Sequence, residues 1–470
     1  MLDGRAEPGH PIFGAAQPQN PQMTDWPDTF TFAGFDIDEA ACEVRLRYAL
    51  GRDMPFTERI VFDSPLPPMG SLLRPAFEAA VETLWLAAGV SYYKTCVPPR
   101  IEIEGASLSD DQRRFFQTLY VDGLGEFGVR NGVDVAARVD FLDARCRAGA
   151  PRLATSPPLP RRSAVLVGGG KDSLVSVEAL RAGGEPMALF AVNPKKPIID
   201  CAAASGLPFV KVSRYLDPLL FTLNDKGALN GHVPITAIVS FVAVAAAFVE
   251  GFDTVVLSNE RSADQGNVFV GGREVNHQYS KTTQAERDIA SQIAAHIHSG
   301  LNYFSFLRPL SEAHIAALMA RATRYDDAFT SCNRSFQINP KTPPKRWCGD
   351  CPKCRFSFLM LAENMGRARI ECVFEKNMLG DETQLEGFEE LTGLSGHKPW
   401  ECVGELAESS AALLRLAGMD EWKDAAIVRA LAPRIHALMP DPAAVWRELM
   451  TPAREHRLPA RYEDMLRDYL

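Results

Sequence analysis

No segment of this 470-residue sequence is both long and apolar enough to cross a membrane. The longest uncharged run, residues 233–249, contains Pro234, Thr236 and Ser240 and is shorter than the roughly 20 residues that a spanning helix needs. It leads directly into a strand-like segment that begins at Thr254, which favours a buried helix packed on a sheet. We therefore expect no membrane association.

The sequence also lacks the marks of a secreted protein and of a general nucleic-acid binder. Its first residues are partly acidic and form no apolar core, so no secretion signal is evident. Ten cysteines in a chain of this length then fit a reducing cytoplasm. A formal net charge of −9 provides no general attraction to a polyanion such as tRNA. We expect a cytoplasmic location and no nucleic-acid partner, and the sequence gives no indication of an oligomeric state.

Two common nucleotide-binding patterns are absent from the glycine-rich segment AVLVGGGKDS, residues 164–173. A Walker A loop would need glycine where Val165 stands, and the dinucleotide fingerprint would need glycine where Ser173 stands. What is present is a short apolar strand, three glycines, and a segment with Leu174 and Leu180 on one helical face. Glycines let the backbone approach phosphate oxygens, and a helix N-terminus favours negative charge. The segment predicts an anion site, although a plain glycine turn is the alternative.

This segment resembles the S-G-G-x-D-S loop of the N-type ATP pyrophosphatases. Gly169, Gly170, Asp172 and Ser173 match that loop, and Gly168 stands where the family usually has serine. Enzymes with the loop cleave ATP between its α- and β-phosphates, so the resemblance implies ATP binding and adenylation of a substrate oxygen. The ATP-binding residues that it implies are Gly168, Gly169, Gly170, Lys171, Asp172, Ser173, Asn193, Ser258 and Asn259.

Two residues of the loop have open roles. Lys171 either neutralises phosphate or points to solvent, and Asp172 either orients the loop or binds magnesium through water. The other polar residues stand where the neighbouring strands are expected to end. Ligands of parallel sheets lie at the carboxyl ends of the strands, so we expect the polar segment that begins at Ser258 to lie over the ATP. A solvated loop is the alternative for that segment.

Four regions are predicted along the chain. Residues 1–27 are rich in Pro, Gly, Gln and Asn and are expected to form a disordered leader. Residues 28–155 begin with period-two alternation over residues 30–63, which predicts antiparallel strands, and continue with helices, one of which is expected to be capped by Ser109. This pattern predicts an α+β N-terminal domain. Residues 160–310 alternate strands and helices, which predicts an ATP-binding α/β domain with a doubly wound parallel sheet. Residues 311–470 are expected to be a helical C-terminal region. The loop implies that the sheet is of the ATP pyrophosphatase (adenine nucleotide alpha hydrolase-like) type.

The C-terminal region contains a cluster of cysteines. Cys348, Cys351 and Cys354 form two overlapping C-x-x-C steps, and Cys332 lies 16 residues upstream. Four thiolates can complete a tetrahedral structural zinc site, and the alternative is a reduced cysteine-rich turn. The cluster is similar to the one at the end of the 7-cyano-7-deazaguanine synthases. The remaining cysteines are scattered, and we expect them to be core residues.

Several motifs in a fixed order extend the resemblance to one family. They are Gly89-Val-Ser-Tyr-Tyr-Lys94, the glycine loop, Ser258-Asn-Glu260, Asn276-His-Gln278 with Ser280-Lys281, and Trp347-Cys-Gly-Asp-Cys-Pro-Lys-Cys354. Over residues 28–460 the chain is similar to the bacterial UDP-N-acetylmuramoyl-L-alanyl-L-glutamate epimerases. That family uses ATP and magnesium to invert the terminal glutamate of the UDP-muramoyl dipeptide, which supplies D-glutamate for peptidoglycan.

The chemistry explains why an epimerase would use ATP. Removing the α-proton beside a free carboxylate creates a dianion, whereas adenylation neutralises the carboxylate and stabilises the enolate. The proton-transfer candidates cluster in sequence at the expected ligand edge and have suitable proton chemistry; they are Glu260, His277, Tyr279 and Lys281. The resemblance implies that the UDP-muramoyl dipeptide is bound by Tyr92, Tyr93, Lys94, Asn276 and Gln278. The alternative for His277 is a structural role as a hydrogen-bonding histidine. The alternative for Tyr92, Tyr93 and Lys94 is two core tyrosines beside a surface lysine.

Three other functions compete with this interpretation. The loop also occurs in 7-cyano-7-deazaguanine synthases and tRNA-modifying enzymes, but the acidic charge and the extra N-terminal domain argue against them. An amide ligase of the asparagine synthetase kind would have a nucleophilic cysteine after the initiator methionine, whereas this sequence has Leu2. A nucleotide-binding sensor would bind ATP without turnover.

Overall fold

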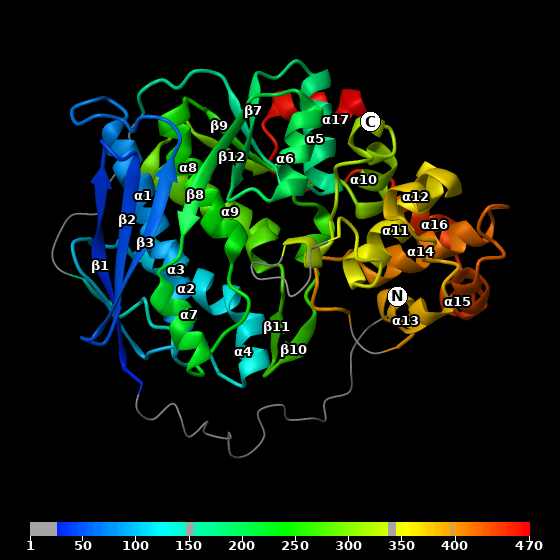
Figure 1. Ribbon diagram of the computed structural model, residues 1–470, viewed down its shortest axis with the longest axis horizontal. Helices are drawn as coiled ribbons and strands as arrows, with labels where there is room; N and C mark the ends of the chain where they lie inside the picture. The colour runs from blue at the N-terminus through cyan, green and yellow to red at the C-terminus, as the bar shows by residue number, and fades with distance from the viewer. Residues whose placement is uncertain (1–25, 147–153, 155, 337–344, 396–397) are drawn as a thin grey trace.

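The computed structural model of the chain describes residues 26–146, 154, 156–336, 345–395 and 398–470. The predicted leader, residues 1–27, lies almost wholly outside this part of the chain. One ten-stranded sheet organises the fold, in the order β12-β9-β6-β7-β8-β3-β2-β1-β4-β5 (Figure 1). Its strands are β1 (Thr29–Asp38), β2 (Glu43–Leu50), β3 (Met54–Phe62), β4 (Arg100–Ile103), β5 (Arg145–Cys146), β6 (Ser163–Leu166), β7 (Met187–Val192), β8 (Phe209–Tyr215), β9 (Thr254–Leu257) and β12 (Asn302–Ser305).

The half of the sheet formed by strands between residues 163 and 305 is parallel, as predicted for the region 160–310. Strands β12, β9, β6, β7 and β8 pair in parallel, and the glycine loop follows the central strand β6. Val165 pairs with Leu189 on one side and Val256 on the other. These apolar strands are covered on both faces, so the part of the sheet that precedes the loop is buried.

The N-terminal strands extend this same sheet. β1, β2 and β3 form an antiparallel meander, which confirms the strands predicted over residues 30–63. β3 then pairs antiparallel with β8, where Ile60 lies opposite Arg214. Arg214 also forms an ion pair with Glu58 of β3, at 2.7 Å between Nε and Oε1. Strands from the predicted N-terminal domain and from the predicted ATP-binding domain therefore share one sheet.

Helices cover both faces of the sheet (Figure 1). Ala164 and Val255 point into one core with helices α1 and α8, whereas the next residues, Val165 and Val256, point into a second core with α5, α10 and α11. This alternation is that of a doubly wound sheet. The helices are α1 (Arg74–Ala88), α2 (Val90–Tyr93), α3 (Asp110–Gly123), α4 (Gly125–Asn131), α5 (Lys171–Ala182), α6 (Lys196–Ser205), α7 (Pro218–Asp225), α8 (Ile235–Glu250), α9 (Thr283–Gln292), α10 (Glu312–Met319), α11 (Pro352–Met365), α12 (Arg367–Phe374), α13 (Leu385–Thr392), α14 (Leu406–Ala417), α15 (Ala426–Leu438), α16 (Pro442–Leu449) and α17 (Ala460–Tyr469).

Local signals placed several of these helices correctly. The hydroxyl of Ser109 accepts a hydrogen bond from the backbone N–H of Gln112 and forms a capping box at the start of α3, as predicted. The uncharged run that begins at Val233 forms the buried helix α8, which packs on α1 and on the sheet. Among the residues that the structure describes, no helix is long and apolar enough to cross a membrane.

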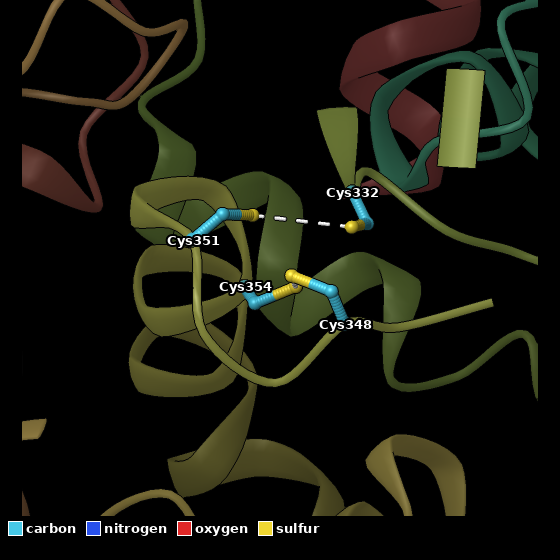
Figure 2. Close-up of side chains that lie close together, drawn as sticks. All are labelled: Cys332, Cys348, Cys351 and Cys354. Atoms are coloured by element: carbon cyan, nitrogen blue, oxygen red, sulfur yellow. Dashed lines mark hydrogen bonds between the residues drawn. The ribbon is translucent and has the colours of Figure 1, made fainter. Parts of the chain in front are cut away.

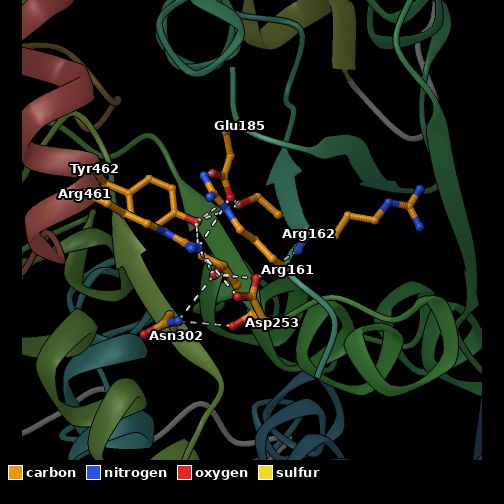
Figure 3. A network of polar contacts seen from close by, with 9 residues as sticks. Arg161, Arg162, Glu185, Asp253, Asn302, Arg461 and Tyr462 are labelled. Carbon is orange, nitrogen blue, oxygen red and sulfur yellow. Dashed lines mark hydrogen bonds and ion pairs between the residues drawn. The ribbon is translucent and has the colours of Figure 1, made fainter. Parts of the chain in front are cut away.

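The last helix is attached to the amino ends of the central strands (Figure 3). The hydroxyl of Tyr462 in α17 donates a hydrogen bond to the buried carboxylate of Glu185, at 2.9 Å, and lies 2.8 Å from the hydroxyl of Ser163. Arg161 completes the network with an ion pair to Glu185 at 2.7 Å. This network holds the C-terminus against the sheet at the edge opposite the glycine loop.

A candidate active site at the glycine loop

The glycine loop connects β6 to the N-terminus of α5. Gly169 has a φ of +77°, a left-handed conformation that glycine adopts without strain, and its carbonyl accepts a hydrogen bond from the backbone N–H of Thr330 at 2.9 Å. A Cβ at Gly170 would lie 2.9 Å from the hydroxyl of Ser331. The segment that contains Thr330 and Ser331 therefore packs against the loop, and glycine is needed there for close approach.

A cavity of about 440 Å³ opens at the carboxyl ends of β6, β7 and β9. Six of the nine predicted ATP-binding residues line it, namely Gly168, Gly170, Asp172, Ser173, Ser258 and Asn259. The hydroxyl of Ser258 lies 2.7 Å from that of Ser176, and the amide of Asn259 donates to Ser305 at 3.0 Å. These bonds fix the strand end next to the loop. Two regions distant in sequence thus form one polar wall.

Asn193 lies at the end of β7 but is not among the residues that line the cavity. Its side-chain amide donates to the carbonyl of Arg214 at 2.6 Å and accepts from the backbone N–H of Arg214 at 2.8 Å. Both groups of the amide are therefore used to join β7 to β8. Asn193 has a φ of +46°, a conformation that asparagine tolerates better than most residues.

Lys171 does not point to solvent, so that alternative from the sequence is wrong. Its side chain is only 3% exposed and forms ion pairs with Asp172 and with Glu312 at the start of α10. Burial opposes the charge on the lysine, but the carboxylates of Asp172 and Glu312 outweigh it and hold the pKa of Lys171 well above its usual value. The ammonium group therefore lies beneath the loop rather than in the cavity.

Three carboxylates meet beside this lysine. Asp172, Glu260 and Glu312 each offer an oxygen within 4.8 Å of the others, close enough to hold one metal ion together. Burial raises the pKa of Glu312 well above its ordinary value, and the charges of Asp172 and Glu260 add to this effect against the opposing effect of Lys171. This crowding favours a proton on Glu312, and a bound cation could replace that proton and stabilise the three ionised carboxylates.

The predicted proton-transfer residues separate into two pairs. Glu260 and Lys281 line the cavity with the glycine loop, whereas His277 and Tyr279 do not. Tyr279 is buried and lines a second cavity of about 380 Å³. His277 forms an ion pair with Glu126 of α4. Burial opposes its charge, but hydrogen bonds with Cys402 and with Glu126 raise the pKa of His277 to about 9.

Cys402 was expected to be a core residue, and the structure shows otherwise. The thiol is only half-buried, and the ammonium of Lys281 donates a hydrogen bond to its sulfur at 3.2 Å. Burial opposes a thiolate there, but the positive charges of Lys281 and then Lys353 outweigh it. Together with a hydrogen bond from His277, these charges lower the pKa of Cys402 to about 5. No local motif marks this cysteine, because Lys281 is 121 residues away in sequence.

The residues predicted to bind the dipeptide are dispersed. Tyr92 and Tyr93 are fully buried core side chains; Tyr92 stacks on Tyr48 with ring centroids 5.0 Å apart, and the hydroxyl of Tyr93 donates to the carbonyl of Pro98. Lys94 is not a surface residue, since it is buried and donates to the side chain of Asn230 at 2.8 Å. Burial lowers its pKa to about 8.

The other two dipeptide candidates lie in the turn before Tyr279. Asn276 lines the second cavity, and its side chain accepts from the backbone N–H of Gln278 at 2.7 Å. Gln278 is buried, and its side-chain oxygen has no hydrogen-bond partner among the described residues. Asn276 therefore helps to shape the turn that presents His277 and Lys281.

The four predicted cysteines converge on one point, as Figure 2 shows. Sγ of Cys332 lies 3.9 Å from that of Cys351, and Sγ of Cys348 lies 3.7 Å from that of Cys354. Four sulfurs at a zinc–sulfur distance of about 2.3 Å on a tetrahedron would lie about 3.8 Å apart. All four sulfurs lie within 4.8 Å of one another, so the cluster could hold a metal ion such as zinc.

Comparisons with known proteins cover almost the whole chain. Residues 22–306 match the MurL N-terminal domain, and residues 328–445 match the MurL C-terminal domain. Three relatives carry the name UDP-N-acetyl-alpha-D-muramoyl-L-alanyl-L-glutamate epimerase. The protein of a Micromonospora species is 42% identical over 443 residues, which are 93% of this chain and 98% of the relative.

The other two relatives are similarly close. The protein of Xanthomonas oryzae pv. oryzae is 41% identical over 92% of this chain and 95% of its own length. That of Salinispora tropica is 41% identical over 93% of this chain and 95% of its own length. These matches confirm the family that the sequence motifs predicted. The chain therefore belongs to the MurL family of UDP-N-acetylmuramoyl-L-alanyl-L-glutamate epimerases.

Proposed function

We propose that this chain inverts the terminal L-glutamate of UDP-N-acetylmuramoyl-L-alanyl-L-glutamate to D-glutamate, a step in the synthesis of peptidoglycan precursors. Three full-length relatives carry the name of this activity. The observation that carries the proposal within the chain is the cavity itself. It brings an anion-binding glycine loop together with Glu260 and Lys281, side chains capable of proton transfer.

We further propose that the reaction begins with adenylation of the α-carboxylate by ATP. The first turn of α5 directs its N–H groups toward the glycine loop, where pyrophosphate would be held. The region 160–310, of ATP pyrophosphatase type in this proposal, would bind the nucleotide beside strands β6, β7 and β9. Thr330, Ser331 and Lys353 of the region 311–470 line the same cavity and would close it.

The residues proposed to hold magnesium are Asp172, Glu260 and Glu312. Their donors fit a hard cation, because Mg²⁺ prefers carboxylate oxygens and the three groups lie close enough to bind one ion together. When bound, the ion would screen the phosphate charges during attack of the carboxylate. Zinc is proposed for Cys332, Cys348, Cys351 and Cys354, where it would have a structural role next to the cavity.

The direct test incubates the purified protein with ATP, magnesium and the UDP-muramoyl L-alanyl-L-glutamate dipeptide. We expect D-glutamate in the hydrolysed product together with AMP and pyrophosphate. The Asp172→Asn variant should lose at least about 100-fold in D-glutamate formation, as expected when a charge-stabilising group is removed. Asp420→Asn is the matched control, because Asp420 is 94% exposed and lies in the C-terminal region.

Two outcomes would contradict the proposal. Glutamate that stays wholly L while the protein binds ATP would exclude the epimerase and favour a nucleotide-binding sensor. AMP formation only with a nucleobase precursor or tRNA would favour the other adenylating enzymes that share the loop.

A further inference from the structure

Residues 398–402 form a short segment that contacts Gln265 and Asn267 as well as Asn333. Lys398 donates to the side chain of Gln265 at 3.1 Å, and the carbonyl of Pro399 accepts from Asn267 at 3.0 Å. Glu401 accepts a hydrogen bond from the side chain of Asn333, which lines the cavity. The segment is thus attached at three positions that directly precede Cys402, whose sulfur accepts a hydrogen bond from Lys281.

The surroundings of Cys402 are those of a reactive cysteine. Lys281, which lines the cavity, contacts the sulfur at 3.2 Å, and Lys353, another cavity residue, also acts on it through its charge. His277 contributes a further positive group. Glu401 and Lys398 are the other titratable groups on the segment that contains Cys402. A half-buried thiol beside such cations is held as a thiolate, the form that acts as nucleophile or base.

The other candidates at the site are poorly suited to accept a proton. Burial opposes the charge on Lys281, but the Cys402 thiolate and then the Glu260 carboxylate outweigh it and hold the pKa of Lys281 well above its usual value, so its ammonium stays protonated. Burial raises the pKa of Tyr279 well above its usual value, and this tyrosine lines the other cavity. His277, with a pKa of about 9, is protonated at neutral pH. Glu260 lies within the carboxylate group that we assign to magnesium.

We propose that Cys402 is a catalytic residue of the epimerisation, with its sulfur exchanging the α-proton of the terminal glutamate at one face of the reaction centre. This assignment rests on the proposed epimerase function and adds a residue to it. Lys281 is a positioning residue in this scheme, since it lines the cavity and contacts the sulfur of Cys402, which lies directly behind it and is not itself among the lining residues.

The proton transfer is balanced without any change of oxidation state. The thiolate takes the proton from Cα of the adenylated glutamate, so an S–H bond forms and the C–H bond breaks. The electron pair moves into the enolate of the acyl group. A proton that originates from water then adds to Cα from the opposite face, and the thiol returns its proton to water. In the reverse direction the same thiol donates to the enolate.

The test compares Cys402→Ala and Cys402→Ser with the wild type in two assays. The first follows substrate-dependent exchange of labelled pyrophosphate into ATP, which reports adenylation alone. The second follows D-glutamate formation and uptake of deuterium at Cα in D₂O. We expect both variants to keep pyrophosphate exchange within about threefold and to lose D-glutamate formation by about 100-fold or more, the usual contribution of acid–base catalysis. Cys372→Ala is the matched control, because Cys372 is exposed.

The outcomes separate the two proposals. Wild-type protein without substrate-dependent exchange and without D-glutamate would overturn the proposed function. Active wild-type protein with active Cys402 variants would overturn only the role of Cys402, and so would variants that lose both assays to the same extent. If the variants fail to fold, alkylation of Cys402 in the wild-type protein provides the same comparison, and an alkylated enzyme that still forms D-glutamate would contradict the proposal.

Discussion

Lys171, the first residue of α5, forms a buried ion pair with Glu312, the first residue of α10. The two residues are 141 positions apart, and both are less than 5% exposed. The pair joins the glycine loop to the beginning of the C-terminal region. The same ammonium also pairs with Asp172, so Lys171 contacts two of the three carboxyl groups of the proposed magnesium site.

We predict that Lys171→Met destabilises the protein by about 3–5 kcal/mol, because it leaves Glu312 buried without a counter-charge. The double variant Lys171→Met/Glu312→Met should recover most of this loss, since it removes both buried charges. Urea unfolding followed by circular dichroism measures the two effects. Lys196→Met is the control, because Lys196 is 83% exposed in its pair with Asp200. Equal stability of Lys171→Met and wild type would contradict the buried pair.

Sequence patterns were sufficient for several local elements of the fold. The apolar strand before the glycines, the capped helix after Ser109 and the alternation over residues 30–63 are local signals, and each formed the predicted element. The antiparallel pairing of β3 with β8 was not predictable in this way. It joins Ile60 to Arg214, and no local pattern determines which strand edges meet across such a distance.

The same limit applies to the site. Glu260 and Lys281 follow polar segments at a strand end, so their position beside the loop could be predicted. The positions of Glu312 and Cys402 in the site could not be predicted, because each contacts a site residue that is more than 100 positions away in sequence. Tyr92 and Tyr93 show the opposite error, since motif membership suggested ligand contacts for side chains that form the core.

The cysteine cluster predicts a bound metal. We expect about one zinc per chain in the purified protein, as for a four-thiolate site. Cys351→Ser should abolish zinc binding and lower the midpoint of thermal unfolding by about 5 °C or more, since metal binding is coupled to folding. Elemental analysis and calorimetry provide the two readouts. Cys42→Ser lies outside the cluster and should retain the metal. Metal-free protein of unchanged stability would contradict the zinc assignment.

The network in Figure 3 predicts that α17 has a purely structural role. Tyr462→Phe removes the hydrogen bonds to Glu185 and Ser163 and should cost about 1–2 kcal/mol in the free energy of unfolding. Turnover per folded molecule should not change, because the network lies at the sheet edge opposite the loop. Tyr469→Phe is the matched control in the same helix. A loss of turnover without a loss of stability would contradict this assignment.

The stability that Glu185 contributes through that network depends on pH, and the direction of this dependence can be predicted. Burial opposes its ionisation, but hydrogen bonds from Arg161, Ser163 and Tyr462 outweigh it and lower its pKa. A carboxylate with a lowered pKa stabilises the fold above its unfolded pKa of about 4.3, and the contribution is lost as the pH falls through the lower folded value. Unfolding of wild type and Glu185→Gln should therefore differ most above pH 5, and the difference should shrink under more acidic conditions.

The last prediction concerns the ionisation of Cys402, independently of turnover. Its pKa of about 5 predicts that iodoacetamide alkylates this thiol at pH 6, where a free cysteine, with a pKa of about 8.5, is almost wholly protonated. The rate should fall as the pH is lowered through about 5. Lys281→Met removes the closest positive charge and should move this midpoint upward. Peptide mass mapping at each pH separates Cys402 from the other cysteines, with N-acetylcysteine as the reference thiol. A midpoint near 8.5 in the folded protein would show that Lys281 does not hold a thiolate, and Cys402 would then lack the proton-accepting form that its catalytic role requires.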